Sequence, residues 1–197
     1  MKLLVVFAHP STDSLGFALF TRTVETLKSQ GHDVQALDLY RMGFDPILSE
    51  AEWKSYLTDT DQNIANVAEH VELLQWAEGL VFVFPTFYYG IPAMMKGWFE
   101  RVWLPGITFE VAKANNQRTV PKMQDKKVIT VITTSGSPHW WIFLIRDPVR
   151  SFFKRGLRPL FGRNCRYIYC QLYNLNHVDH DKGNKFLDYV EKRLRSI

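Results

Sequence analysis

Short apolar runs alternate along this chain with longer stretches in which apolar residues recur at helical spacing. The apolar runs predict five strands, at Lys2–Ala8, Asp33–Leu39, Gly79–Phe84, Lys127–Thr133 and Arg166–Leu172. Strands rich in Val, Leu and Ile are typical of a parallel sheet that is buried on both faces. Helices between the strands then form crossovers above and below the sheet. The pattern therefore predicts an α/β three-layer sandwich on a five-stranded parallel sheet.

Several helices carry end signals. Asp13 or Ser14 can cap the first, which ends at Gly31. Ser49 and Glu52 form a capping box for a short helix. The other predicted helices are Asn63–Glu78, Ala93–Trp103, Trp140–Arg155 and Lys182–Arg195, and an irregular polar excursion is predicted at Thr108–Asp125. Five strands at this spacing predict the sheet order 2-1-3-4-5.

Size and composition narrow the class of protein. The chain has 197 residues, of which 46% are apolar and 22% charged, so a single domain over residues 1–197 with a full core is expected. The net charge of +4 is too small to indicate nucleic-acid binding. No apolar stretch is long enough to embed the chain in a membrane, and the run Leu3–Ala8 predicts a strand instead of a signal peptide.

The two cysteines, Cys165 and Cys170, have an odd separation, which sends them to opposite faces of a strand. An internal disulfide is therefore not expected, and a cytoplasmic protein fits. The polar segment Asn176–Asp181 contains metal-ligand side chains, but its place before the last helix favours helix capping, and no metal site is predicted.

Three loops attract attention because, in this sheet order, the segments after the first, third and fourth strands meet at one end. The loop HPSTDSLG opens a helix, whose free N–H groups and hydroxyl side chains suit phosphate. The next loop places Phe87, Tyr88 and Tyr89 directly after a strand, where their flat faces suit a planar cofactor. In the third, Ser135 and Gly136 offer backbone N–H groups. Ordinary capped turns, or aromatic residues in a core or an oligomer contact, are the alternatives.

Four segments in order are similar to a known family: FAHP at 7–10, DLYRMGFDPILS at 38–49, FPTFYYGIPAMMKGWFERV at 84–102 and ITTSGS at 132–137. Together they resemble the flavodoxin-like NAD(P)H:quinone oxidoreductases. That family includes DT-diaphorases, modulators of drug activity and ancillary proteins of potassium efflux systems. The resemblance is good over residues 1–140 and loose beyond them.

The resemblance implies a flavodoxin-like, flavin-dependent NAD(P)H dehydrogenase (quinone) with FAD, or FMN in some members. NAD(P)H would pass a hydride to the flavin, and a quinone or similar flat acceptor would then take both electrons in a ping-pong cycle. It also implies a homodimer with each flavin at the subunit interface. The implied cofactor-binding residues are His9, Ser11, Ser14, Leu15, Gly16, Pro85, Thr86, Phe87, Tyr88, Tyr89, Thr134, Ser135 and Gly136.

The chain departs from the family pattern after Ser137. Relatives place a Tyr and a His near the flavin's pyrimidine carbonyl, and an ungapped alignment puts Trp141 and Asp147 at those positions. Trp141 can donate only from its indole N–H, so His139 or Arg146 is a candidate to stabilise the anionic reduced ring. The alternative functions are a flavin-binding regulatory subunit of a membrane ion transporter and a one-electron carrier of flavodoxin type.

The segment 146–166 is strongly basic. It holds one acid, Asp147, and the cations Arg146, Arg150, Lys154, Arg155, Arg158, Arg163 and Arg166. Three interpretations stay open at this point. The cations attract the 2′-phosphate of NADPH, or they bind an anionic partner or membrane surface, or they form a solvated face whose intervening Phe and Leu residues pack inward.

Overall fold

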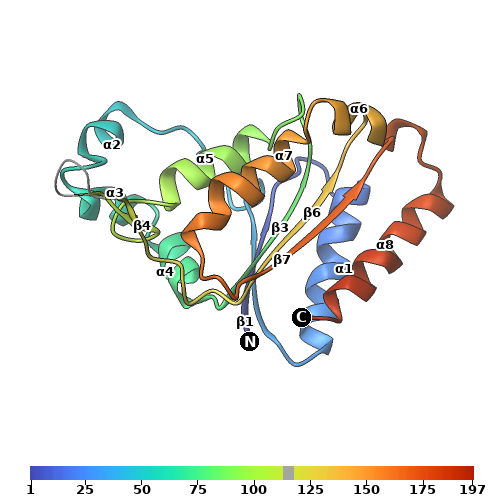
Figure 1. The fold of residues 1–197 in the computed structure, drawn as a ribbon, viewed down its shortest axis with the longest axis horizontal. Coiled ribbons are helices and arrows are strands. Elements are labelled where there is room, and N and C mark those ends of the chain that lie inside the picture. Colours follow the sequence, from blue (N-terminus) through green and yellow to red (C-terminus); the bar gives the residue numbers. More distant parts are fainter. Residues whose placement is uncertain (113–117) are drawn as a thin grey trace.

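The computed structural model describes residues 1–112 and 118–197. Its main sheet has five strands in the order β2-β1-β3-β6-β7, and every neighbouring pair is parallel (Figure 1). The strands are β1 (Lys2–Phe7), β2 (Asp33–Asp38), β3 (Gly79–Pro85), β6 (Val128–Thr134) and β7 (Arg166–Leu172). Because β6 and β7 are the fourth and fifth strands of this sheet along the chain, the predicted order 2-1-3-4-5 is confirmed.

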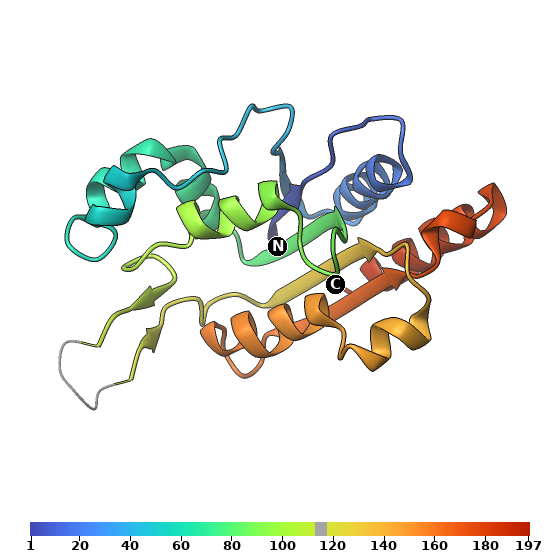
Figure 2. The same ribbon diagram turned by 90° about the horizontal axis from the view of Figure 1, so that it is seen from above.

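Helices cover both faces of the sheet (Figures 1 and 2). One face packs against α1 (Leu15–Ser29) and α8 (His180–Leu194), and the other against α4 (Ala68–Trp76), α5 (Ala93–Val102) and α7 (Pro148–Ser151). Alternate strand residues enter the two cores, with Leu4 and Val6 on one side and Val5 and Phe7 on the other. The three-layer sandwich is therefore confirmed, and both central strands β1 and β3 are buried on each face.

The local end signals are confirmed at two helices. Ser14 caps α1, its hydroxyl accepting from the N–H of Phe17 at 3.1 Å. The capping box is complete at α2 (Glu50–Ser55): the hydroxyl of Ser49 accepts from the N–H of Glu52, whose carboxylate accepts from the N–H of Ser49. These short-range signals depend only on neighbouring residues, which is why the sequence identifies them.

The single helix predicted at Asn63–Glu78 is wrong. The chain forms α3 (Thr60–Asn66) and α4, separated at Val67, whose φ of −136° and ψ of 29° are not helical. The amide of Asn63 donates to the carbonyl of Glu52 at 2.9 Å, and the amide of Asn66 to the Glu52 carboxylate at 3.3 Å. The break lets α3 dock on α2 while Val67 enters the core.

The continuous helix predicted at Trp140–Arg155 is also wrong. α6 (His139–Leu144) ends before Arg146 and Asp147, which have positive φ values of 64° and 41°. α7 begins at Pro148, which has no N–H to continue a helix, and Asp147 caps it. A π-helical turn (Phe152–Leu157) and a 3-10 turn (Arg158–Leu160) follow, and a further 3-10 turn lies at Leu175–His177.

The predicted excursion between the third and fourth sheet strands contains a short antiparallel pair, β4 (Phe109–Glu110) and β5 (Val120–Pro121). Residues 113–117 of that prediction lie outside the described residues. Cys165 and Cys170 are free and buried, and they enter opposite cores, as the odd separation predicts. Among the described residues, no helix has the length and apolar character needed to span a bilayer.

Candidate functional site

The loops after β3 and β6 are joined by hydrogen bonds at the carboxyl end of the sheet. The backbone N–H and the hydroxyl of Thr86 both donate to the carbonyl of Thr134, at 2.8 and 3.0 Å. The N–H of Ser135 donates to the carbonyl of Leu172 at 2.7 Å. These bonds hold the ends of β3, β6 and β7 together, so that groups from separate strands face one opening.

The loop after β3 is a tight turn that displays its aromatic rings. Phe87 and Gly90 exchange two backbone hydrogen bonds, of 3.1 and 2.9 Å. Between them, Tyr88 and Tyr89 have φ values of 47° and 63°, a conformation that bulky residues avoid. Two positive φ values suit a hairpin turn of type I′, where Asn and Gly are the usual residues. Strained backbone of this kind is concentrated at ligand sites, which makes this turn a candidate for one.

A cavity of about 360 Å³ opens between this turn and the loop after β6. Its lining residues are Thr86, Phe87, Tyr88, Tyr89, Ser135, Gly136 and Ser137. The rings of the turn are exposed, whereas Ser135 is buried. One wall is thus aromatic and the other offers hydroxyl and backbone groups, which is the combination that a flat, partly polar ring requires.

Of the candidate catalytic residues, Trp141 lies next to the aromatic turn. Its indole Nε1 donates to the hydroxyl of Tyr89 across 3.1 Å. His139 stands at the start of α6 with its ring edge against Tyr173, at a centroid distance of 4.8 Å. Arg146 lies beyond the end of α6 and lines a different groove. The structure therefore joins Trp141 to a residue that lines the cavity, whereas it packs His139 on Tyr173 and places Arg146 in another groove.

The loop after β1 is organised around His9. The N–H of Ser11 donates to Nδ1 of His9 at 3.0 Å, and the hydroxyl of Ser14 lies 3.2 Å from the same nitrogen. The same Nδ1 lies 2.9 Å from the carbonyl oxygen of Ser11, so it accepts from the N–H or donates to the carbonyl according to the tautomer of the ring. The first N–H groups of α1, including those of Leu15 and Gly16, have no partner within the helix. The loop can therefore donate to an anion.

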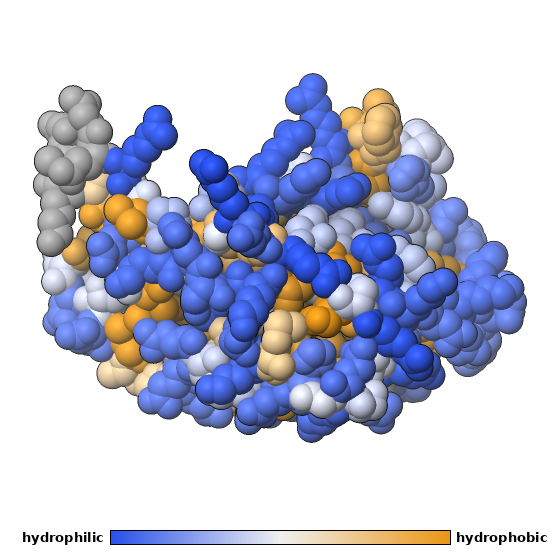
Figure 3. Space-filling model, turned by 60° about the horizontal axis from the view of Figure 1, so that its bottom comes forward, coloured by the Kyte–Doolittle hydropathy of each residue, from blue (hydrophilic) through white to orange (hydrophobic). Residues whose placement is uncertain are grey.

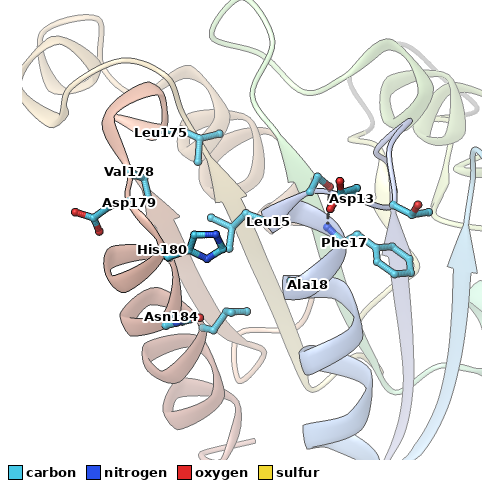
Figure 4. A pocket seen from close by; sticks show the side chains of 13 residues that line it. Asp13, Leu15, Phe17, Ala18, Leu175, Val178, Asp179, His180 and Asn184 are labelled. Carbon is cyan, nitrogen blue, oxygen red and sulfur yellow. Dashed lines mark hydrogen bonds between the residues drawn. The ribbon is translucent and has the colours of Figure 1, made fainter.

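A second cavity, of about 530 Å³, lies on the other side of this loop, between the N-terminal ends of α1 and α8 (Figure 4). Thr12, Asp13 and Leu15 line it from the loop and α1, and His180 and Asn184 from α8. The ring of His180 points across the cavity toward Leu15. The sequence pattern did not single out this cavity, because its two walls lie more than 150 residues apart in the chain.

Asp147 has a structural environment that its sequence position did not reveal. Its carboxylate accepts from the N–H of Arg150 at 3.0 Å and lies 3.2 Å from the hydroxyl of Tyr169, whose one proton is shared with the amide oxygen of Gln171 at 2.7 Å. Burial, together with the nearby Asp147 carboxylate, raises the pKa of Tyr169. The carboxylate is thus engaged by α7 and β7. The polar segment 176–181 behaves as predicted, since Asp179 caps α8 by accepting from the N–H of Lys182 at 2.8 Å.

The fold is flavodoxin-like, and the three predicted loops lie at the carboxyl edge of the sheet. The family model for the flavodoxin-like fold matches residues 1–143. NAD(P)H dehydrogenase [quinone] 1 of Cavia porcellus is 32% identical over 221 residues, which cover all of this chain and 77% of that protein.

Among solved structures, Smu.1420 from Streptococcus mutans has a TM-score of 0.85 at 26% identity and covers 100% of both chains. An FMN-dependent NADH-azoreductase from Bacillus anthracis, solved in complex with FMN, has a TM-score of 0.76 at 19% identity, covering 99% of this chain and 98% of that one, and shows the fold alone. The chain belongs to the flavodoxin-like NAD(P)H dehydrogenase (quinone) family.

Proposed function

We propose that this protein is a flavin-dependent NAD(P)H:quinone oxidoreductase whose flavin ring occupies the cavity beside the Phe87–Gly90 turn. The observation that carries the proposal is the strained pair Tyr88 and Tyr89, which line the same cavity as the Ser135–Ser137 loop. An aromatic wall fits the face of a flavin, and N–H and hydroxyl groups fit its polar edge. Bound flavin would supply hydride acceptance and donation, while the protein orients the ring and stabilises its charge.

The loop after β1 would hold the flavin phosphates. The imidazole of His9, the hydroxyl of Ser11 and the first N–H groups of α1 can donate to an anion at this helix N-terminus, where negative charge is stabilised. Ser14 has a second duty as the helix cap. Since the sequence leaves FAD and FMN open, the neighbouring cavity lined by Leu15 and His180 favours FAD, because it offers space for an adenosine group beyond the phosphates.

Trp141 is the residue we assign to the acceptor side of the site. The indole N–H is the only hydrogen-bond donor of this side chain, and it lies at the rim of the ring cavity. To bind an acceptor, it would have to leave its bond with Tyr89. NAD(P)H and a quinone would use this opening in turn, so ping-pong kinetics are expected. His139 and Arg146 stay candidates for charge stabilisation, although both would need a ligand that extends beyond the cavity.

We further propose a homodimer in the cytoplasm. The resemblance implies that a second subunit covers each flavin, and the fully exposed ring of Tyr88 is consistent with a site that needs a cover. Light scattering of the purified protein tests this directly. A mass twice the 23.0 kDa of the chain supports the dimer, and a monomer at micromolar concentration contradicts it.

The flavin assignment is tested by the chromophore of the purified protein. We expect absorbance bands near about 370 and about 450 nm, with a released cofactor whose mass is that of FAD. If the released cofactor has the mass of FMN, the assignment of the ring site would stand, but the second cavity would not bind an adenosine group. A colourless protein that takes up neither flavin would contradict the site.

A further inference from the structure

The outer side of α6 exposes large apolar side chains to water. Trp140 is 65% exposed, Phe143 78% and Leu144 65%, all within one six-residue helix. Single exposed apolar residues are normal, but a cluster of them marks an interaction surface. Figure 3 shows a hydrophobic projection on the side of the molecule where α6 lies, with long hydrophilic side chains projecting beside it. We call this surface the α6 face.

Cationic side chains border the α6 face. A groove of about 620 Å³ lies beside it, with Phe143 and Leu144 in its lining together with the four cations Arg146, Arg150, Lys154 and Arg155. In the part of the chain that the structure describes, none of the four cations pairs with a carboxylate. The one carboxylate in the groove, Asp147, is already bonded to backbone and tyrosine donors.

Two further cations of the basic segment have structural roles. Arg158 donates to the carbonyls of Gly162, Arg163 and Cys165, and Arg166 bonds Ser196. Phe153 and Phe161 are buried in the core. The interpretation of inward-packing aromatics is therefore correct for these positions. Of the four groove cations, Arg150 stacks on the ring of Tyr169, with its guanidinium carbon 5.5 Å from the ring centroid, and its charge still lines the groove.

We propose that the α6 face binds the surface of an anionic phospholipid bilayer. Exposed Trp and Phe side chains suit the boundary between headgroups and acyl chains, while Lys and Arg are attracted to anionic lipid. The four cations and the apolar projection lie side by side, so both attractions act at one contact. The charge of the patch is complementary to lipid and opposed to its own copy, because a symmetric contact between two α6 faces would bring cations together.

The position of the α6 face suggests a function for membrane binding, and this step rests on the proposed quinone reductase function. Trp141, on the same helix as Phe143, bonds the aromatic turn at the proposed ring site. Long-chain quinones partition into bilayers because of their apolar tails. A protein that rests on the bilayer through the α6 face would hold its site close to that pool of acceptor.

The test is flotation of the full chain with protein-free vesicles. We expect binding to vesicles of phosphatidylcholine mixed with phosphatidylglycerol, and little binding to phosphatidylcholine alone. Binding should weaken between 0.1 M and 1 M salt, as the screening length falls from about 10 to about 3 Å. The variant Lys154→Gln/Arg155→Gln should need roughly tenfold more lipid or more for half-maximal binding. The variant Phe143→Ser/Leu144→Ser should weaken binding even at low salt.

Matched controls separate this surface from general charge and hydrophobicity. Lys28→Gln/Lys192→Gln removes two exposed cations elsewhere, and Leu57→Ser removes a comparably exposed leucine. Both should bind vesicles as the parent protein does. All variants should keep the parent's flavin content and its rate with a water-soluble quinone. With a long-chain quinone inside anionic vesicles, the groove and projection variants should be at least several-fold slower.

Absence of binding to anionic vesicles would overturn the proposal, as would equal loss in the control variants. Binding only to native membranes that contain integral proteins would indicate a protein partner instead of lipid, and would also overturn the proposal. So would a change of the oligomeric state in Phe143→Ser/Leu144→Ser, because the face would then contact a second copy. A protein without flavin that still binds anionic vesicles would contradict the proposed function and retain the lipid surface.

Discussion

The indole Nε1 of Trp141 donates a hydrogen bond to the hydroxyl of Tyr89 across 3.1 Å. This bond joins α6 to the strained turn whose residues line the proposed ring cavity. It connects a catalytic candidate predicted from the sequence with an aromatic residue of the turn. The relationship can be tested without disturbing the core, because both rings lie at the surface of the sheet's carboxyl edge.

Trp141→Phe removes this donor and retains an aromatic ring of similar position. A hydrogen bond between side chains at a partly exposed site contributes about 0.5–1.5 kcal/mol. If it positions the turn for the transition state, kcat/KM with a soluble quinone should fall by about 2- to 10-fold, with flavin content unchanged. Steady-state kinetics and the absorbance spectrum measure the two quantities.

Trp140→Phe is the matched control, because Trp140 is 65% exposed and a Phe there keeps an aromatic ring beside Trp141. Its kcat/KM with the soluble quinone should equal that of the parent. Tyr89→Phe removes the acceptor, and combining it with Trp141→Phe should add little to either single loss. Fully additive losses would mean that the two residues act independently.

Glu52 and Arg101 are expected to make stability depend on acid pH. Burial raises the pKa of this carboxyl, but the Ser49 N–H and the Arg101 guanidinium, 2.6 Å away, outweigh it and lower the pKa to about 2. The folded pKa lies below the unfolded value of 4.5, so the stabilisation is complete above pH 4.5 and is lost as the pH falls toward 2. Glu52→Gln keeps the capping-box geometry and removes the charge.

We expect Glu52→Gln to lower the free energy of unfolding by about 3 kcal/mol near pH 7, because it leaves the largely buried Arg101 unpaired. Urea denaturation at several pH values measures this. The loss should shrink between pH 4.5 and pH 2. Glu50→Gln, which breaks the exposed pair with Lys54, should cost less than about 1 kcal/mol. Equal losses for the two variants would contradict the account.

Gly97 is required where α5 passes the chain before α2. A Cβ at this position would overlap the carbonyl oxygen and the Cα of Pro46, and backbone atoms cannot turn aside as a flexible side chain can. Gly97→Ala should therefore destabilise the protein by about 1–3 kcal/mol or more, measured by thermal or urea unfolding. Gly156→Ala, whose Cβ would meet only Phe152 at 4.0 Å, is the control and should be close to neutral. A neutral Gly97→Ala would refute the close approach.

Both thiols should be inert in the folded protein. Burial raises the pKa of Cys170 to about 11 and raises the pKa of Cys165 as well. The reactive thiolate is therefore scarce near neutral pH, and access is blocked. An aromatic disulfide reagent at pH 8 should label neither cysteine in native protein and both after unfolding. Rapid labelling of the native protein would show that one of the two cores opens readily.

The sequence predicts those features that depend on neighbouring residues or on a strict pattern. The five strands, the cap at Ser14 and the Ser49–Glu52 box belong here. The sequence does not predict where a helix ends when that end depends on contacts with residues distant in the chain. The break at Val67 follows from amides that reach Glu52, and the end of α6 follows from the left-handed pair Arg146 and Asp147.

The candidate site divides in the same way. The three loops were predictable, because strand order alone brings their starting points together. The strained backbone of Tyr88 and Tyr89 was not, since no local rule places two bulky residues at positive φ. The cavity between α1 and α8 depends on how two helices from opposite ends of the chain pack, which periodicity does not encode.

The most direct test of the central claim is an anaerobic titration of the purified, flavin-loaded protein with NADPH. The account predicts that the band near about 450 nm bleaches in one step with a single equivalent of NADPH, and that a quinone restores it. A protein that binds neither FAD nor FMN would contradict the ring site at the Phe87–Gly90 turn. A flavin that is reduced only in two separate one-electron steps would contradict hydride transfer and favour an electron carrier.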